Sequence, residues 1–161
     1  LQRQMCIRDS GWANRANYAA IGIHQTGPTE MSMFLTNGRR YTLRLDGVAS
    51  VNAPLDGGEL ITKPLKFAGN ELEINYSTSA FGSDQVELQD KFGSVLPGYS
   101  LSQCRMIYGD EVGYRVCWDD GSDVRNLAAK PIKLRFILKD ADLYSFKIGP
   151  FSSNDKCFGR T

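Results

Sequence analysis

The segment Lys130–Ile148, KPIKLRFILKDADLYSFKI, constrains the fold more than any other part of the chain. Apolar side chains alternate with charged or polar ones in both of its halves, on either side of the Asp-Ala-Asp at 140–142. Successive side chains of a strand point to opposite faces, so each half predicts a half-buried β-strand. We expect two strands joined by an acidic corner, with the first, Lys130–Leu138, central in its sheet and Phe136 buried.

The rest of the chain contains many short alternating runs separated by turn signals. They lie at 21–23, 31–36, 41–45, 72–76, 86–89 and 114–118, and a further short strand is expected around Val48 and Val51. Asn37-Gly38 between two such runs is a strong hairpin signal, because both turn positions need positive φ. Small residues at 77–83 predict a loop, and Val124–Ala129 predicts one helical turn around Leu127. The pattern indicates an all-β fold, a two-sheet antiparallel β-sandwich with few or no helices.

Length and charge exclude some partners. The 161 residues suffice for one domain with a substantial core. The 19 basic and 18 acidic residues give a formal charge of +1, so electrostatics provides no reason to expect nucleic acid or an anionic membrane as a partner. No apolar run approaches the roughly 20 residues that cross a bilayer. We therefore expect neither partner.

Both ends of the chain fall outside the alternating pattern. Residues 1–10, LQRQMCIRDS, resemble the translated sequencing adapter that precedes many metagenomic fragments, so we expect an artefact there. Residues 151–161 follow the last convincing strand without apolar rhythm, and we expect an unstructured or artefactual tail. Neither end enters the fold prediction.

These ends contain Cys6 and Cys157, which leaves Cys104 and Cys117 for the folded part. Their separation is compatible with adjacent strands, so a disulfide between them stays open. Two buried free thiols are the favoured alternative, because neither count nor spacing resembles a disulfide scaffold.

Few residues suggest catalysis or metal binding. His24 is the single histidine, no CxxC pair occurs, and no Gly-x-Ser-x-Gly elbow accompanies a candidate triad. The acidic pairs at 110–111, 119–120 and 140/142 lie at turns, where aspartate bonds nearby backbone. Asp119, Asp120 and Asp123 could jointly hold calcium, although no helix-loop-helix context surrounds them. We expect no catalytic residue, no metal and no cofactor.

Aromatic side chains provide the only candidate binding site. Tyr99, Tyr114 and Trp118 could stack on sugar rings if they lay at an exposed rim. Trp118 alternates in phase with Tyr114 and Val116, so burial in the core is the favoured alternative for it.

Several longer segments of the sequence resemble a known family. They are LRLDGVASVNAP, GGELITKPLKF, LEINYSTSAFGSDQVELQD, PGYSL, GDE and GSDVRNLAAKPIKLRFILKDADLYSF. They resemble the C-terminal β-sandwich of bacterial proteins related to glycoside hydrolase family 32, the invertase and β-fructosidase group. The upstream WANRANYAAIGIHQTGPTEMSMF resembles the end of the five-bladed propeller that precedes that sandwich.

This resemblance implies a domain organisation and a role. It implies a propeller remnant over 11–38 and a concanavalin- or lectin-like sandwich over 39–150. Catalytic carboxylates come from the propeller in such enzymes, so none is carried over to this chain. The sandwich is expected to stabilise or assist the propeller of a secreted or periplasmic parent hydrolase, whose substrate is left open. The alternative is an autonomous carbohydrate-binding module.

An orphaned interdomain surface is a further expectation. The segments 18–23 and 31–35 carry several apolar side chains and little charge. If they belong beside a propeller, they expose an apolar patch in this chain, and the chain should self-associate.

Overall fold

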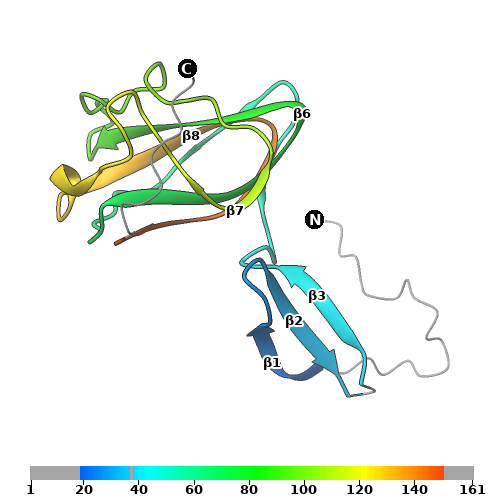
Figure 1. Cartoon of the computed structure of the whole chain (residues 1–161). Helices are drawn as coiled ribbons and strands as arrows, with labels where there is room; N and C mark the ends of the chain where they lie inside the picture. Colours follow the sequence, from blue (N-terminus) through cyan, green and yellow to red (C-terminus); the bar gives the residue numbers. More distant parts are fainter. Residues whose placement is uncertain (1–18, 37, 151–161) are drawn as a thin grey trace. The chain divides into compact units, whose positions relative to one another are not determined.

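The computed structural model of the chain describes residues 19–36 and 38–150. The chain divides into two compact units, residues 1–45 and 46–161 (Figure 1). The described residues form two antiparallel sheets, of three and five strands, and one short 3₁₀ turn. The predicted all-β class with two antiparallel sheets is therefore confirmed.

The first unit contains the three-stranded sheet, in the order β1-β2-β3. Its strands are β1 (Ala19–Gln25), β2 (Glu30–Leu35) and β3 (Arg40–Arg44). Gly38, at φ +82°, donates its N–H to the Leu35 carbonyl over 2.9 Å, and β2 and β3 pair as the expected hairpin. Strand β3 pairs with β2, and the first unit extends to Leu45.

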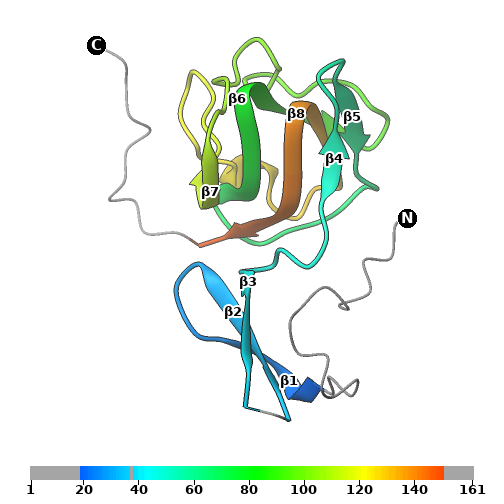
Figure 2. The same cartoon turned by 90° about the vertical axis from the view of Figure 1, so that its right-hand side faces the viewer.

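The second unit is built on two long strands that pair with each other. Its strands are β4 (Val51–Ala53), β5 (Gly58–Ile61), β6 (Glu71–Asp90), β7 (Asp110–Arg115) and β8 (Ile132–Gly149). The order is β4-β8-β6-β7, and β5 also pairs with β8 (Figure 2). The segment that dominates the sequence pattern is thus the central strand, as expected.

Both long strands bend at the same place. Thr78 pairs with Ala141 and Ser83 with Lys139, so four residues of β6 lie opposite the single residue Asp140. Asp140 has φ +43°, a left-handed conformation that aspartate tolerates. The two strands expected over 130–148 are therefore one bent strand, and the loop expected at 77–83 is a bulge within β6.

Glycine is required at this bend. A Cβ atom at Gly82 would collide with the carbonyl oxygens of Lys139 and Asp140, so no larger residue fits without a backbone shift. Figure 1 shows that β6 and β8 curl past the bend, so the halves of one sheet enclose a common core. Bulges increase local twist and bending, which accounts for the curl.

One hydrophobic cluster lies between these halves. Strand β6 contributes Leu72, Ile74 and Tyr76 before the bend and Val86 and Leu88 after it. Strand β8 contributes Ile132, Leu134, Phe136, Leu138, Ala141 and Leu143. Phe136 is fully buried, as predicted from its place in the alternating pattern.

The predicted helical turn is also present. It is the 3₁₀ turn η1 (Arg125–Leu127), which buries Leu127. Among the described residues, no helix has the length and hydropathy needed to span a membrane.

Replacement of Phe136 by alanine tests the position of the core. We expect Phe136→Ala to lower the free energy of unfolding by about 3–5 kcal/mol, since it removes buried surface and leaves a cavity. Urea denaturation followed by far-UV circular dichroism measures this loss. Phe81→Ala is the matched control, because Phe81 is 85% exposed and its removal should change little. Equal effects of the two changes would contradict this core.

Candidate functional site

Trp118 lies in the core and not at a rim. Its side chain is 1% exposed, and its indole N–H donates to the Val86 carbonyl over 3.0 Å. Its ring makes an edge contact with Tyr99, with ring centres 5.2 Å apart. A buried indole cannot stack on a sugar, so Trp118 is a structural residue, and the favoured alternative for it is correct.

The two tyrosines of the predicted site also pack on the core and lie in different contacts. The Tyr99 hydroxyl donates to the Asp123 carbonyl over 2.8 Å, and burial, with the charge of Asp123, raises its pKa. Tyr114 packs edge-on against Tyr76, with ring centres 5.5 Å apart, and burial, with the charge of Glu111, raises its pKa. Of the three aromatic residues, Tyr99 and Trp118 contact each other, whereas Tyr114 contacts Tyr76.

Other aromatic side chains reach the surface. The most exposed among the described residues are Phe81, Phe92 and Tyr108. Phe81 lies in the bulge of β6, and Phe92 lies in the turn that follows β6. Neither residue belongs to a run in which apolar and polar side chains alternate. This feature of the sequence could have distinguished them from the aromatic residues of the core.

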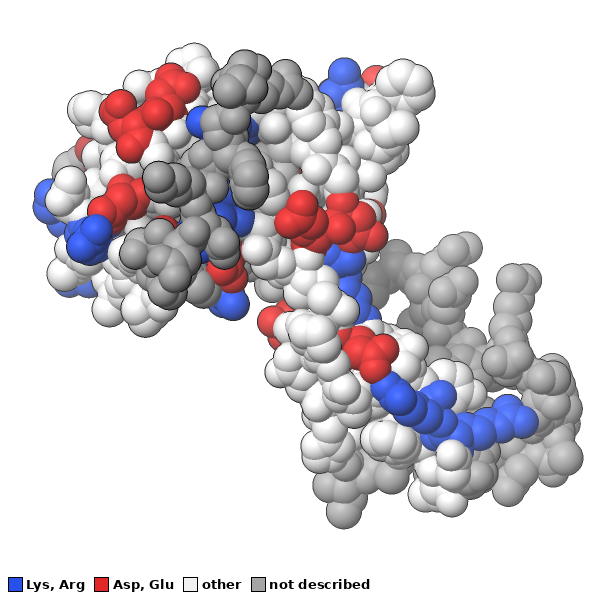
Figure 3. Space-filling view, viewed as in Figure 1, with Lys and Arg blue, Asp and Glu red and all other residues white. Residues whose placement is uncertain are grey.

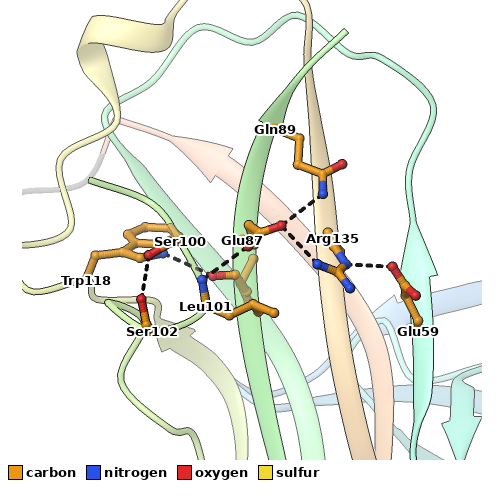
Figure 4. Close-up of polar contacts among 9 residues, drawn as sticks. Glu59, Glu87, Gln89, Ser100, Leu101, Ser102, Trp118 and Arg135 are labelled. Carbon is orange, nitrogen blue, oxygen red and sulfur yellow. Dashed lines mark hydrogen bonds and ion pairs between the residues drawn. The ribbon is translucent and has the colours of Figure 1, made fainter. Parts of the chain in front are cut away.

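A charged network crosses the sheet on the face opposite Val86 and Leu88. Arg135 on β8 binds Glu59 of β5 over 2.6 Å and Glu87 of β6 over 3.2 Å (Figure 4). Glu87 also accepts hydrogen bonds from the Gln89 amide over 2.9 Å and from the Leu101 N–H over 3.3 Å. The network therefore joins three strands and the loop that carries Leu101.

These contacts determine the protonation of Glu87. Burial alone would raise the pKa of Glu87, but hydrogen bonds from Gln89, Arg135 and Leu101, with the charge of Arg135, lower it below its ordinary value. Glu87 is thus held as a carboxylate by fixed partners. An acid with saturated partners stabilises the fold and is poorly placed to exchange protons with a substrate.

The acidic turn has a structural partner. The Asp123 carboxylate accepts hydrogen bonds from the backbone and guanidinium of Arg125, which lower its pKa. No group of three or more histidine, cysteine, aspartate or glutamate residues within 19–36 and 38–150 is arranged to hold a metal ion. His24 lies exposed on β1, opposite Ser32 of β2.

The cysteines differ from both alternatives. Cys104 is a buried free thiol, and burial raises its pKa to about 11, so it stays protonated at neutral pH. Cys117 is disulfide-bonded, and its partner lies outside the described residues. The two therefore do not pair with each other, and only Cys104 is the free thiol that was favoured for both.

The least expected group is Asp84 on β6. Its side chain is 0% exposed, and neither carboxylate oxygen accepts a hydrogen bond from any described residue. Burial, with a smaller contribution from the charge of Asp142, raises the pKa of this carboxyl to about 7. Asp84 is the one described acid that combines full burial, no partner and a titration near neutrality.

The surface charge is mixed. In the view of Figure 3, acidic and basic side chains of the second unit occur in small separate groups, with no broad field of one sign on this face. Comparison of the chain with protein-family models, curated proteins and solved structures finds no match. The resemblance to the family 32 sandwich therefore stays a prediction.

Removal of Arg135 tests the charged network. We expect Arg135→Met to lower the free energy of unfolding by about 1.5–3 kcal/mol, because it removes charged hydrogen bonds from the buried Glu87. Chemical denaturation at pH 7 measures the change. Arg125→Met is the control, since it removes an exposed ion pair with Asp123 and should have little effect. An equally small effect of Arg135→Met would show that the network contributes nothing.

Proposed function

We propose that the second unit is the non-catalytic accessory sandwich of a larger protein related to glycoside hydrolase family 32. Its role is to stabilise or assist a five-bladed propeller domain of that protein. The observation that carries this proposal is the incomplete burial of the first unit. Among residues 22–36 and 38–45, only Ser32 and Leu35 are buried.

A three-stranded sheet with so little buried surface requires cover from elsewhere. Ile23 is 46% exposed and Phe34 is 40% exposed, whereas independent sheets bury one apolar face. A propeller blade has four antiparallel strands, so β1–β3 have one strand fewer than a blade. In this proposal the first unit is the end of the propeller, and the preceding blades cover its apolar face.

The carboxylates of the second unit support a non-catalytic role. Glycosidases need two carboxyl groups that flank the scissile bond across a cleft. Glu59 and Glu87 share Arg135, Glu71 binds Arg115 over 2.8 Å, and Asp123 binds Arg125. These contacts engage the acids with structural cations.

The second candidate is an autonomous carbohydrate-binding module. The observation that favours it is the exposure of Phe81, Phe92 and Tyr108, since exposed rings stack on the apolar faces of sugars. The burial of Trp118 and the packing of the half-buried Tyr99 against it weigh against a sugar site built from Tyr99, Tyr114 and Trp118.

Turnover and binding assays separate these candidates from an enzyme. We expect no hydrolysis of sucrose, inulin or aryl glycosides by this chain, since Glu59, Glu71, Glu87 and Asp123 are held by arginine side chains and Asp84 is buried. We also expect no saturable binding of millimolar sugar in calorimetric titration. Saturable binding that Phe81→Ala removes would favour the carbohydrate-binding module. A complete parent reading frame without an upstream propeller would overturn the accessory role.

The exposed apolar side chains of β1 and β2 predict self-association. We expect light scattering of the chain to give an apparent mass that rises with concentration, because Ile23 is 46% exposed and Phe34 is 40% exposed. The double change Ile23→Ser/Phe34→Ser should lower this mass. Val48→Ser is the control, since Val48 is an exposed apolar residue of the second unit. A monodisperse monomer at high concentration would contradict the need for a covering domain.

A further inference from the structure

Residues 105–109 form a strap along β6 at its bend, where it bonds to Tyr76, Thr78 and Asp84. The strap lies between Cys104 and β7 and contains only an isolated bridge, no regular strand. The N–H of Asp84 donates to the Ile107 carbonyl over 3.0 Å, and the N–H of Ile107 returns a bond of the same length. The Tyr76 hydroxyl donates to the Tyr108 carbonyl over 2.7 Å. At its ends, the Arg105 N–H donates to the Cys117 carbonyl over 3.1 Å, and Gly109 and Thr78 exchange two bonds of 2.7 and 3.0 Å.

The strap covers the buried carboxyl of Asp84. Residues of an antiparallel pair that exchange both hydrogen bonds lie directly opposite each other, with side chains on the same face of the sheet. Ile107 is buried, so its side chain accompanies that of Asp84 on the inner face. Asp84 is also in phase with Val86 and Leu88, so it takes a place that the pattern of β6 gives to apolar residues.

The groups around this carboxyl do not neutralise it. Asp142 of β8 acts on Asp84 and raises its pKa, and Tyr76 of β6 senses the charge of Asp84. Strand β7 adds Asp110 and Glu111, which act on the same Tyr76 hydroxyl. The strap carries Arg105 and Tyr108, and β8 carries the exposed Lys139 beside the bend. None of these side chains gives Asp84 a hydrogen bond.

An ionised carboxylate without a partner is costly to bury, whereas a neutral acid is much less so. We propose that the 105–109 strap is a proton-operated latch, closed over Asp84 when its carboxyl is protonated and opened to water when it ionises. Opening of the strap is the least disruptive relief, because β6 and β8 pair along an extended ladder, whereas the strap is held by a short group of hydrogen bonds. The open state exposes Ile107 and the Tyr76 hydroxyl.

The direction of the pH effect follows from linkage. The carboxyl has a pKa of about 7 in the closed state and an ordinary aspartate pKa when water reaches it. The closed state therefore binds the proton more tightly and is favoured at low pH. Between about pH 4 and pH 7, the equilibrium constant for closure should fall nearly tenfold per pH unit. Above about pH 7 the equilibrium constant for closure should not fall further.

Amide hydrogen exchange of the whole chain tests the latch. We expect the protection factors of the Asp84 and Ile107 amides, corrected for intrinsic exchange, to fall nearly tenfold per pH unit from pH 4.5 to 6.5. The β8 amides at 134–138 should be more protected at every pH, since the strap opens without unfolding of the sheet. Equal protection of strap and β8 amides would leave only global unfolding and overturn the latch.

Matched variants identify the group that titrates. Asp84→Asn keeps the shape and stays neutral, so the pH dependence of strap protection should disappear. In Asp142→Asn, the protection factors of the strap amides should fall with pH at the same rate, but the fall should end at a lower pH. The reason is that the charge of Asp142 raises the pKa of Asp84. Asp56→Asn removes an exposed acid and should behave as the unaltered chain. Persistence of the slope in Asp84→Asn would overturn the proposal.

A direct titration keeps the test decisive if Asp84→Asn fails to fold. The carbon-13 resonance of the Asp84 carboxyl in the unaltered chain should titrate with a midpoint of about 7. A midpoint at the ordinary aspartate value would mean that the carboxyl is solvated in the closed state, and the latch would be excluded.

Discussion

The pairing of β6 with β8 is the interaction on which the second unit depends. Each strand carries apolar side chains on both sides of a shared bend, and each supplies a large part of the core. The bend exists because Gly82 permits close backbone approach and Asp140 adopts a left-handed conformation. One sheet can thereby provide both layers around the core, and the other strands of the unit extend its edges.

The fold was predictable where the determining signals are local. The alternation of β8 and the hairpin of β2 and β3 need only neighbouring residues, and both are present in the structure. The continuity of β6 was not predictable, because residues 79–82, SAFG, show no alternation of apolar and polar side chains and their place is determined by contacts with β8, distant in sequence. The position of β3 likewise depends on its pairing with β2.

The candidate site was harder to predict, because residue type does not determine exposure. Trp118 alternates in phase with Val116, and this phase correctly indicated burial over sugar stacking. The same argument applies to Asp84, whose position in phase with Val86 and Leu88 marks an acid on an apolar face. The sequence does not indicate which segment lies beside Asp84. Residues 105–109 have no apolar alternation that would predict a strand, and they pair with Asp84 through an isolated bridge.

Two acids of β6 show how environment sets the role of a carboxyl group. Glu87 and Asp84 are both buried, yet they lie on opposite faces of the strand. Arg135, Gln89 and the Leu101 N–H hold Glu87 charged, so its contribution to stability is present above its ordinary pKa and is lost as pH falls. Asp84 has no such partner, and its contribution has the opposite sign, since stability is lost as pH rises. The partnered acid therefore ties the sheet together, while the unpartnered one makes the adjacent strap responsive to protons.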